Sequence, residues 1–215
     1  MTNGKIGAEF LLAEFNAIQQ RAIQIEQSKS SSINFYLVIV AAAIAGVSGT
    51  INLFPGAEIS LLFFITSAFI LVVGCLTLDH SINQAATIVL LYRRAGRIRR
   101  YFLEQSKDIE PYLPFQATDA LPRIYLPASL TYRGAEVTVF VINIASISIM
   151  SAAIFSFLSW TGTAIVSIAI AGIFWLLQNL YCRRKLTRFE ASAQRKVLFP
   201  MSLPEEGITL PKRIK

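Results

Sequence analysis

Four long apolar runs, none with a charged residue in its middle, constrain this sequence more than any other feature. They cover roughly residues 33–53, 59–78, 137–158 and 163–182. A helix needs about 20 apolar residues to cross a bilayer, and a charge at its centre costs about 2.5–3.5 kcal/mol on insertion scales. Because the runs are continuous rather than alternating, they favour helices over strands. The sequence therefore predicts an all-α integral membrane protein with four transmembrane helices.

Short connections pair these runs into two predicted hairpins. Pro55-Gly56 marks a turn in the first connection, and Trp160 in the second suits a membrane–water interface. Charged residues make up 15% of the chain, against about 25% in soluble domains. Spans of this length outweigh the nucleic-acid binding that a net charge of +7 would otherwise suggest.

The distribution of Lys and Arg predicts the orientation. All 20 of these residues lie in the N-terminal tail, in the segment 79–136 or in the C-terminal tail, and neither hairpin connection contains one. Because cytoplasmic loops are rich in Lys and Arg, both termini and the large central segment are expected in the cytoplasm. Glu9 and Glu14 precede the first span, unlike the basic start of a signal peptide, so this span is expected to remain uncleaved.

The helices are expected to extend beyond the spans into a cytoplasmic bundle. In the N-terminal tail, apolar residues recur at spacings of four and three, which marks one helix face: Leu11, Phe15, Ile18, Ala22 and Ile25. Residues 79–104 contain no proline and should extend the second span, with apolar and basic residues on opposite sides: Ile88, Leu91, Ala95 and Phe102 against Arg93, Arg97 and Arg100. After the fourth span, residues 183–199 are expected to be helical.

Two segments break this pattern. Residues 111–134 contain four prolines, yet side chains such as Tyr112 and Ile124 are too apolar for a loose linker. We expect an ordered, irregular segment packed on the cytoplasmic helices or along the membrane interface. Residues 1–199 should thus form a single membrane domain, and residues 200–215 a flexible tail with little to bury.

Few residues suggest catalysis or metal binding. His80 is the single histidine, and Cys75 and Cys182 lie far apart and are expected to be free thiols. No metal and no cofactor is expected, since a metal site needs several ligands at suitable spacing. The motifs of serine hydrolases, phosphate-binding loops and zinc proteases are missing. The prediction is a protein that is not an enzyme, with lipid chemistry at Asp79 and His80 as a third hypothesis.

Small residues spaced four apart predict close helix packing within the spans. The predicted packing residues are Ala41, Ala42, Ala45, Gly46, Gly49, Ser148, Ala152 and Ser156. Packing within one chain and packing between subunits of a homo-oligomer both stay open.

Two basic clusters follow the second and fourth spans. They comprise Arg93, Arg94, Arg97, Arg99 and Arg100, and then Arg183, Arg184 and Lys185. We expect them to contact anionic membrane lipids, at about 1 kcal/mol per residue near the surface, and a cytoplasmic protein partner. A nucleotide or a nucleic acid is the alternative, because one face carries a ladder of arginines suited to phosphates.

An amphipathic helix over Ala8–Gln27 runs directly into a small-residue span. The second span ends in Leu78-Asp79-His80 and is followed by the aromatic, Gly- and Arg-containing stretch Tyr92–Tyr101. This arrangement resembles a broad group of uncharacterised bacterial four-helix membrane proteins, over roughly the first half of the chain. The resemblance implies no activity, cofactor or catalytic residue. Some small bacterial membrane proteins of this shape look like effectors or partners in anti-phage (antiviral) defence.

The leading hypothesis is a non-enzymatic, multi-pass protein of the bacterial inner membrane. It would self-associate through its spans and present a basic cytoplasmic surface to a partner or signal. The alternative is a pore-forming or channel-type membrane effector, with anti-phage defence as one setting.

Overall fold

Four α-helices form the protein in the computed structural model. They are α1 (Thr2–Leu53), α2 (Ile59–Gln105), α3 (Ala135–Ile154) and α4 (Trp160–Gln194). The structure describes residues 2–53, 59–106, 108, 110, 113, 117–122, 135–156 and 159–199. By length and composition all four helices can cross a membrane, which confirms the predicted all-α class and its four apolar helices. The predicted tail at 200–215 and most of the segment 111–134 lie outside the described residues.

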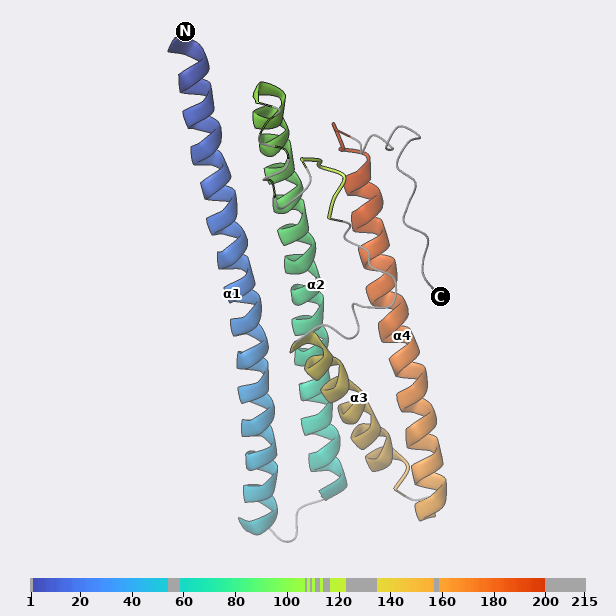
Figure 1. Cartoon of the computed structure of the whole chain (residues 1–215). Helices are drawn as coiled ribbons and strands as arrows, with labels where there is room; N and C mark the ends of the chain where they lie inside the picture. Colours follow the sequence, from blue (N-terminus) through green and yellow to red (C-terminus); the bar gives the residue numbers. More distant parts are fainter. Residues whose placement is uncertain are drawn as a thin grey trace, which may run out of the picture.

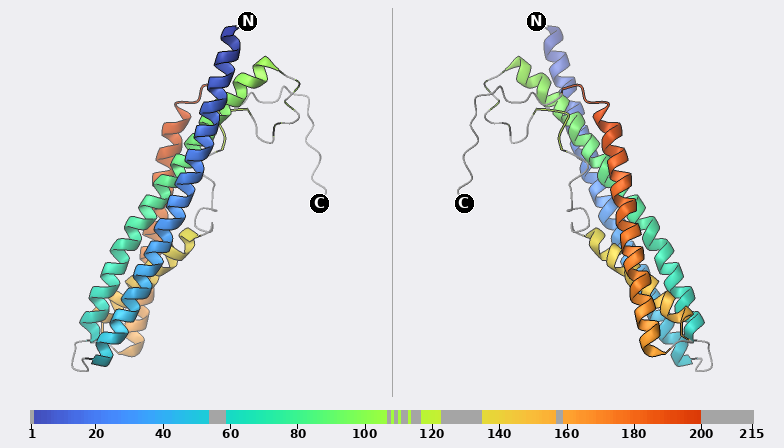
Figure 2. Two further views of the ribbon diagram at one scale, coloured as in Figure 1. Left: turned by 90° about the vertical axis from the view of Figure 1, so that its left-hand side faces the viewer. Right: turned by 90° about the vertical axis from the view of Figure 1, so that its right-hand side faces the viewer.

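The helices form a long, narrow bundle with two distinct halves (Figures 1 and 2). α1 and α2 pack antiparallel along most of their length, and α3 lies between α2 and α4 in the lower part of Figure 1. We call this lower part the apolar half: α3, together with residues 33–53, 59–78 and 160–182. The charged half contains the remaining residues of α1, α2 and α4. These three helices run without a break from one half into the other.

Two helix ends differ from the sequence prediction. α3 ends at Ile154, short of the expected residue 158, and a turn follows at Phe155 and Ser156. The Thr163 hydroxyl donates to the Phe155 carbonyl oxygen (2.9 Å), which satisfies an acceptor at the end of the helix. α4 ends at Gln194 rather than at residue 199, because the backbone that follows turns toward Asp119, which accepts a hydrogen bond from the Leu198 N–H.

In the charged half, the predicted apolar face of the N-terminal helix packs on α2. Ile18 and Ala22 of α1 form a buried cluster with Leu91, Ala95 and Ile98 of α2. The flanking side chains are Leu11, Phe15, Ile25, Tyr92 and Phe102. The spacing of four and three in the sequence is therefore confirmed as a packing face.

The apolar half is apolar on its outside and partly polar inside. Val38, Ile65 and Ile168 are 63%, 56% and 72% exposed. The buried residues include several polar ones, namely Ser67, Asn143, Ser146, Ser151, Ser167 and Gln178. Helices that associate in lipid use small and polar residues at their contacts, since apolar side chains gain little by leaving hydrocarbon. The distribution is that of a membrane-embedded bundle.

Gly74 joins three helices at one level of the apolar half. The Tyr36 hydroxyl of α1 donates to Asn143 Oδ1 of α3 (3.2 Å), and both side chains are fully buried. A Cβ on Gly74 of α2 would lie 1.8 Å from Asn143 Oδ1 and 2.6 Å from the Tyr36 oxygen. The hydrogen bond therefore passes over a position that only glycine can occupy.

We predict that Gly74→Ala destabilises the bundle by about 1–3 kcal/mol, because the new methyl group overpacks this contact. Thermal unfolding in detergent, followed by circular dichroism, measures the change. Gly172→Ala is the matched control, since a Cβ there meets no atom within 4 Å. An equal loss in both variants would contradict the role of Gly74.

Candidate functional site

Residues 117–122, here called the strap, lie against α2 in the charged half. Thr118 and Asp119 are 7% and 1% exposed. Gly96 of α2 allows the approach, because a Cβ there would lie 2.1 Å from the Thr118 carbonyl oxygen. The Thr118 hydroxyl donates to the Phe199 carbonyl oxygen (2.9 Å), so the strap also holds the chain that follows α4. These six residues belong to the segment 111–134, most of which lies outside the described residues.

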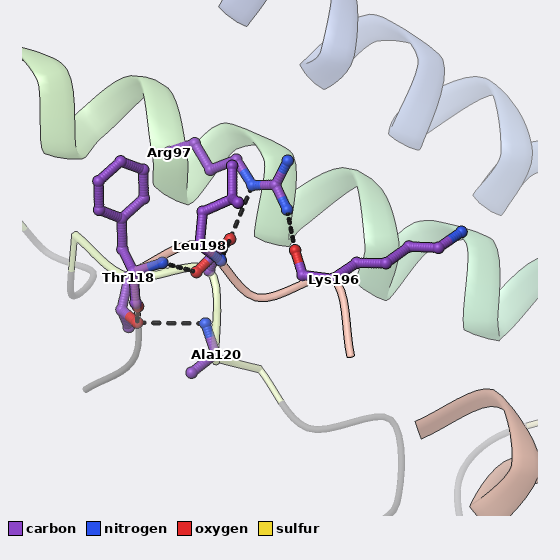
Figure 3. Close-up of polar contacts among 7 residues, drawn as sticks. Arg97, Thr118, Ala120, Lys196 and Leu198 are labelled. Carbon is purple, nitrogen blue, oxygen red and sulfur yellow. Dashed lines mark hydrogen bonds and ion pairs between the residues drawn. The ribbon is translucent and has the colours of Figure 1, made fainter. Parts of the chain in front are cut away.

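Asp119 is the centre of this contact. Its Oδ2 accepts hydrogen bonds from Arg97 Nε (2.7 Å) and from the Leu198 backbone N–H (2.9 Å). Its Oδ1 accepts from the Phe199 backbone N–H (2.9 Å). Arg97 also donates through Nη2 to the Lys196 carbonyl oxygen (2.5 Å), as Figure 3 shows. One carboxylate therefore ties α2 to the residues that follow α4.

Burial alone would raise the pKa of the Asp119 carboxyl. The backbone N–H groups of Leu198 and Phe199 and the Arg97 guanidinium stabilise the ionised form, and together they lower the pKa below its ordinary value. The carboxyl is therefore ionised at neutral pH despite being buried.

Arg93 makes a second connection between the same elements. Its Nη2 donates to both carboxylate oxygens of Glu190 in α4 (2.8 and 2.9 Å), and its Nε donates to the Pro122 carbonyl oxygen of the strap (3.0 Å). Arg93 is 4% exposed. Its third nitrogen, Nη1, is buried and has no hydrogen-bond partner among the described residues.

The arginines after Leu78, predicted together as a surface for lipid or a partner, divide into two groups. Arg93 and Arg97 bind groups of the chain itself, so this part of the predicted surface is covered. The helical pattern placed these arginines on one face but could not show that the strap lies on it. Arg94 and Arg100 are exposed, with Arg100 paired to Glu104 (2.8 Å). Arg99 lies over the Phe15 ring, 5.4 Å from its centroid.

The second basic cluster lies where α4 passes between the two halves. Lys185 and Tyr181 of α4 both donate to Asp79 Oδ1 of α2. Asn83 donates to Asp79 Oδ2 (3.2 Å). Arg183 and Arg184 are exposed.

A similar contact joins α1 to α3 at the same boundary. Lys29 pairs with Glu136 (2.5 Å), and Ser81 of α2 donates to the same carboxylate (3.1 Å). His80 is exposed. The boundary between the halves is thus marked by ion pairs that link neighbouring helices.

The predicted packing residues of α1 face outward. Ala41, Ala42, Ala45 and Gly46 are exposed and Gly49 is half-buried. A Cβ at Gly46 or Gly49 would meet no atom within 4 Å. In the third helix Ser148 and Ala152 are half-buried, and Ser156 is exposed in the turn after α3. Among the described residues, the series on α1 therefore makes no close helix contact, and it is open to lipid or to another subunit.

Comparison with protein-family models, curated proteins and solved structures finds no match. Among the described residues, no group of three or more His, Cys, Asp and Glu side chains could hold a metal ion.

We predict that Asp119→Asn releases the strap at neutral pH. The substitution removes at least one charge-assisted hydrogen bond, worth about 1.5–3 kcal/mol. Hydrogen exchange of the amides in 117–122 should rise. In the control variant Asp108→Asn, which changes an exposed carboxylate, exchange of the same amides should not rise.

The pH dependence has a definite sign. Because folding lowers the pKa of Asp119, its contribution is fully present above the unfolded value of about 3.9 and is lost as pH falls through the folded value. Protection of the strap amides, taken relative to their intrinsic exchange rate at each pH, should stay constant from pH 8 to pH 5 and fall only in strong acid. Opening near pH 6 would contradict this assignment.

Proposed function

We propose that this protein is a non-enzymatic, multi-pass protein of the bacterial inner membrane that self-associates and presents a basic cytoplasmic surface to a partner or signal. One observation carries the proposal: continuous helices join an apolar half with outward-facing apolar side chains to a charged half held together by ion pairs. The first half suits hydrocarbon and the second suits water. Neither half has an evident place for catalysis in the described residues.

The orientation that we propose has two hairpins, with the charged half and both termini in the cytoplasm. Arg and Lys are concentrated in the charged half and in the C-terminal tail, as the positive-inside rule requires. Trp160, at the start of α4, is 86% exposed at the opposite end of the bundle. An aromatic residue there suits the membrane–water interface on the side away from the cytoplasm.

Height along the helices divides the basic residues by role. Arg94 and Arg100 follow Leu78 by 16 and 22 residues, which corresponds to about 24 and 33 Å at about 1.5 Å per residue. A headgroup layer is only about 5–8 Å deep on each side. Lipid contact is therefore proposed for Arg183 and Arg184, which directly follow the fourth span. Arg94 and Arg100 are proposed to contact a protein partner or a signal.

Self-association is proposed to use the exposed small residues of α1. Ala41 and Ala45 lie one helical turn apart on an exposed surface that none of the described helices covers. Small residues let two helix backbones approach closely in lipid, where van der Waals packing drives association. If these small residues served packing within one chain, α2 or α3 would cover them.

A channel-type effector, with anti-phage defence as one setting, is the second candidate. It is favoured by the buried polar side chains of the apolar half, since hydroxyl and amide groups can line a pore. Gln178 is 6% exposed, and both its side-chain nitrogen and its oxygen lack partners among the described residues. The two candidates differ in whether vesicles that contain the protein leak ions.

Self-association can be tested with the double variant Ala41→Leu and Ala45→Leu. Larger side chains should hold the backbones apart and lower the dimer association constant at least tenfold, which corresponds to about 1.4 kcal/mol. Crosslinking in native membranes measures the dimer fraction. Ile44→Leu is the control, because Ile44 is 59% exposed on α1 and lies outside the small-residue series. A monomeric unsubstituted protein would refute the proposal.

Lipid contact can be tested with Arg183→Gln and Arg184→Gln combined. At about 1 kcal/mol per basic residue, affinity for phosphatidylglycerol should fall about thirtyfold. Native mass spectrometry of the protein with retained lipid measures the loss. Arg94→Gln combined with Arg100→Gln should retain the affinity, because both residues lie beyond the headgroups. The reverse pattern would exclude the division of roles.

A further inference from the structure

The donors around Asp119 form an oxyanion-binding arrangement. Two consecutive backbone N–H groups, of Leu198 and Phe199, and the Nε of Arg97 converge on one carboxylate. Successive backbone amides with an adjacent guanidinium are a common way for proteins to bind an anionic group. The donors come from α2 and from the chain after α4, whereas the carboxylate comes from the strap. The anion is thus supplied by a separate segment of the chain.

A neighbouring donor indicates that a carboxylate does not use the whole site. Arg93 lies one helical turn before Arg97, and its Nη1 is buried without a partner among the described residues. The oxygens of Asp119 accept hydrogen bonds from Arg97, Leu198 and Phe199, whereas Arg93 donates to Glu190 and Pro122 instead. A buried donor without a partner costs about 1–3 kcal/mol, and more when it is charged. An anion with three or more oxygens would offer Arg93 an acceptor that the carboxylate lacks.

We propose that Asp119 is an internal competitor for a phosphate-binding site, and that a soluble phosphate-bearing ligand binds there by displacing the strap. The ligand would take the hydrogen bonds of Arg97 and of the Leu198 and Phe199 amides. Release of the strap would also free Arg93 Nε, which now donates to the Pro122 carbonyl oxygen. The ligand phosphate would then be bound by two guanidinium groups and two amides.

Height along α2 favours a soluble ligand over a lipid headgroup. Arg97 follows Leu78 by 19 residues, or about 29 Å along the helix axis at about 1.5 Å per residue. The headgroup layer ends about 5–8 Å from the hydrocarbon. This step rests on the proposed function, since it assumes that the membrane surrounds the apolar half.

The inference gives the charged half a means of regulation. The strap now ties α2 to the chain after α4 through Asp119 and Thr118. Displacement of the strap would break these ties. The direct contacts would remain, namely Arg97 with the Lys196 carbonyl oxygen and Arg93 with Glu190. A phosphate-bearing signal would thereby release the strap, and the donors beneath the strap would bind the phosphate instead of Asp119.

The experiment uses the full chain in detergent, with inorganic phosphate as the probe and chloride at equal ionic strength as the reference. In the unsubstituted protein, phosphate should increase hydrogen exchange of the Ala120 amide, which donates to the Thr118 hydroxyl (3.1 Å). The Leu198 and Phe199 amides should stay protected, because they pass from one anion to another.

Asp119→Ala removes the competitor, so its affinity for phosphate should rise at least tenfold over that of the unsubstituted protein. The further substitution Arg97→Ala should abolish that gain. Asp108→Ala is the matched control for the loss of one negative charge, and its affinity should not change.

Four outcomes would overturn the inference. The first is no gain in phosphate affinity for Asp119→Ala, and the second is a gain that survives Arg97→Ala. If Asp119→Ala does not fold, the third decides: phosphate leaves strap exchange in the unsubstituted protein unchanged. Strap opening by phosphatidylglycerol nanodiscs but not by phosphate would also exclude a soluble ligand. Self-association is measured separately, so failure here would leave the proposed function standing.

Discussion

The high free energy of a charged side chain in hydrocarbon is the constraint on which the rest of this structure depends. It keeps charge out of the middle of four helices and concentrates it in one half of the bundle. At the boundary between the halves, two ion pairs link neighbouring helices, Lys29 with Glu136 and Lys185 with Asp79. Deeper in the charged half, the same preference for compensated charge brings Asp119 to Arg97 and Glu190 to Arg93.

The helices and the packing face of α1 could be predicted because both depend on local spacing. Phe15 and Ile18 lie on one face for the same reason that makes the segment helical, so periodicity reveals both at once. The Asp119 cluster has no such signal. Its partners lie 22, 79 and 80 residues away. Nothing near Asp119 in the sequence distinguishes a buried carboxylate from an exposed one in an irregular segment.

The arginines of α2 show where a pattern stops being informative. Arg93 and Arg94 are neighbours in the chain, yet one is 4% exposed and the other lies on the surface. A helix turns by about 100° per residue, so adjacent side chains point in different directions. The sequence pattern placed the two residues in one basic cluster. The different roles of Arg93 and Arg94 become evident only when the strap is placed against α2. The prolines around the strap do not predict its course.

Continuity of the helices has a mechanical consequence. α1 contains 52 residues in a single α-helix, which is a rod about 78 Å long. A tilt of about 5° about one end moves the other end of such a rod by about 7 Å. Displacement at the tip of α1 is therefore amplified geometrically, and no hinge within α1 absorbs it. A small tilt of the apolar part of α1 therefore displaces the opposite end of the helix by several ångströms.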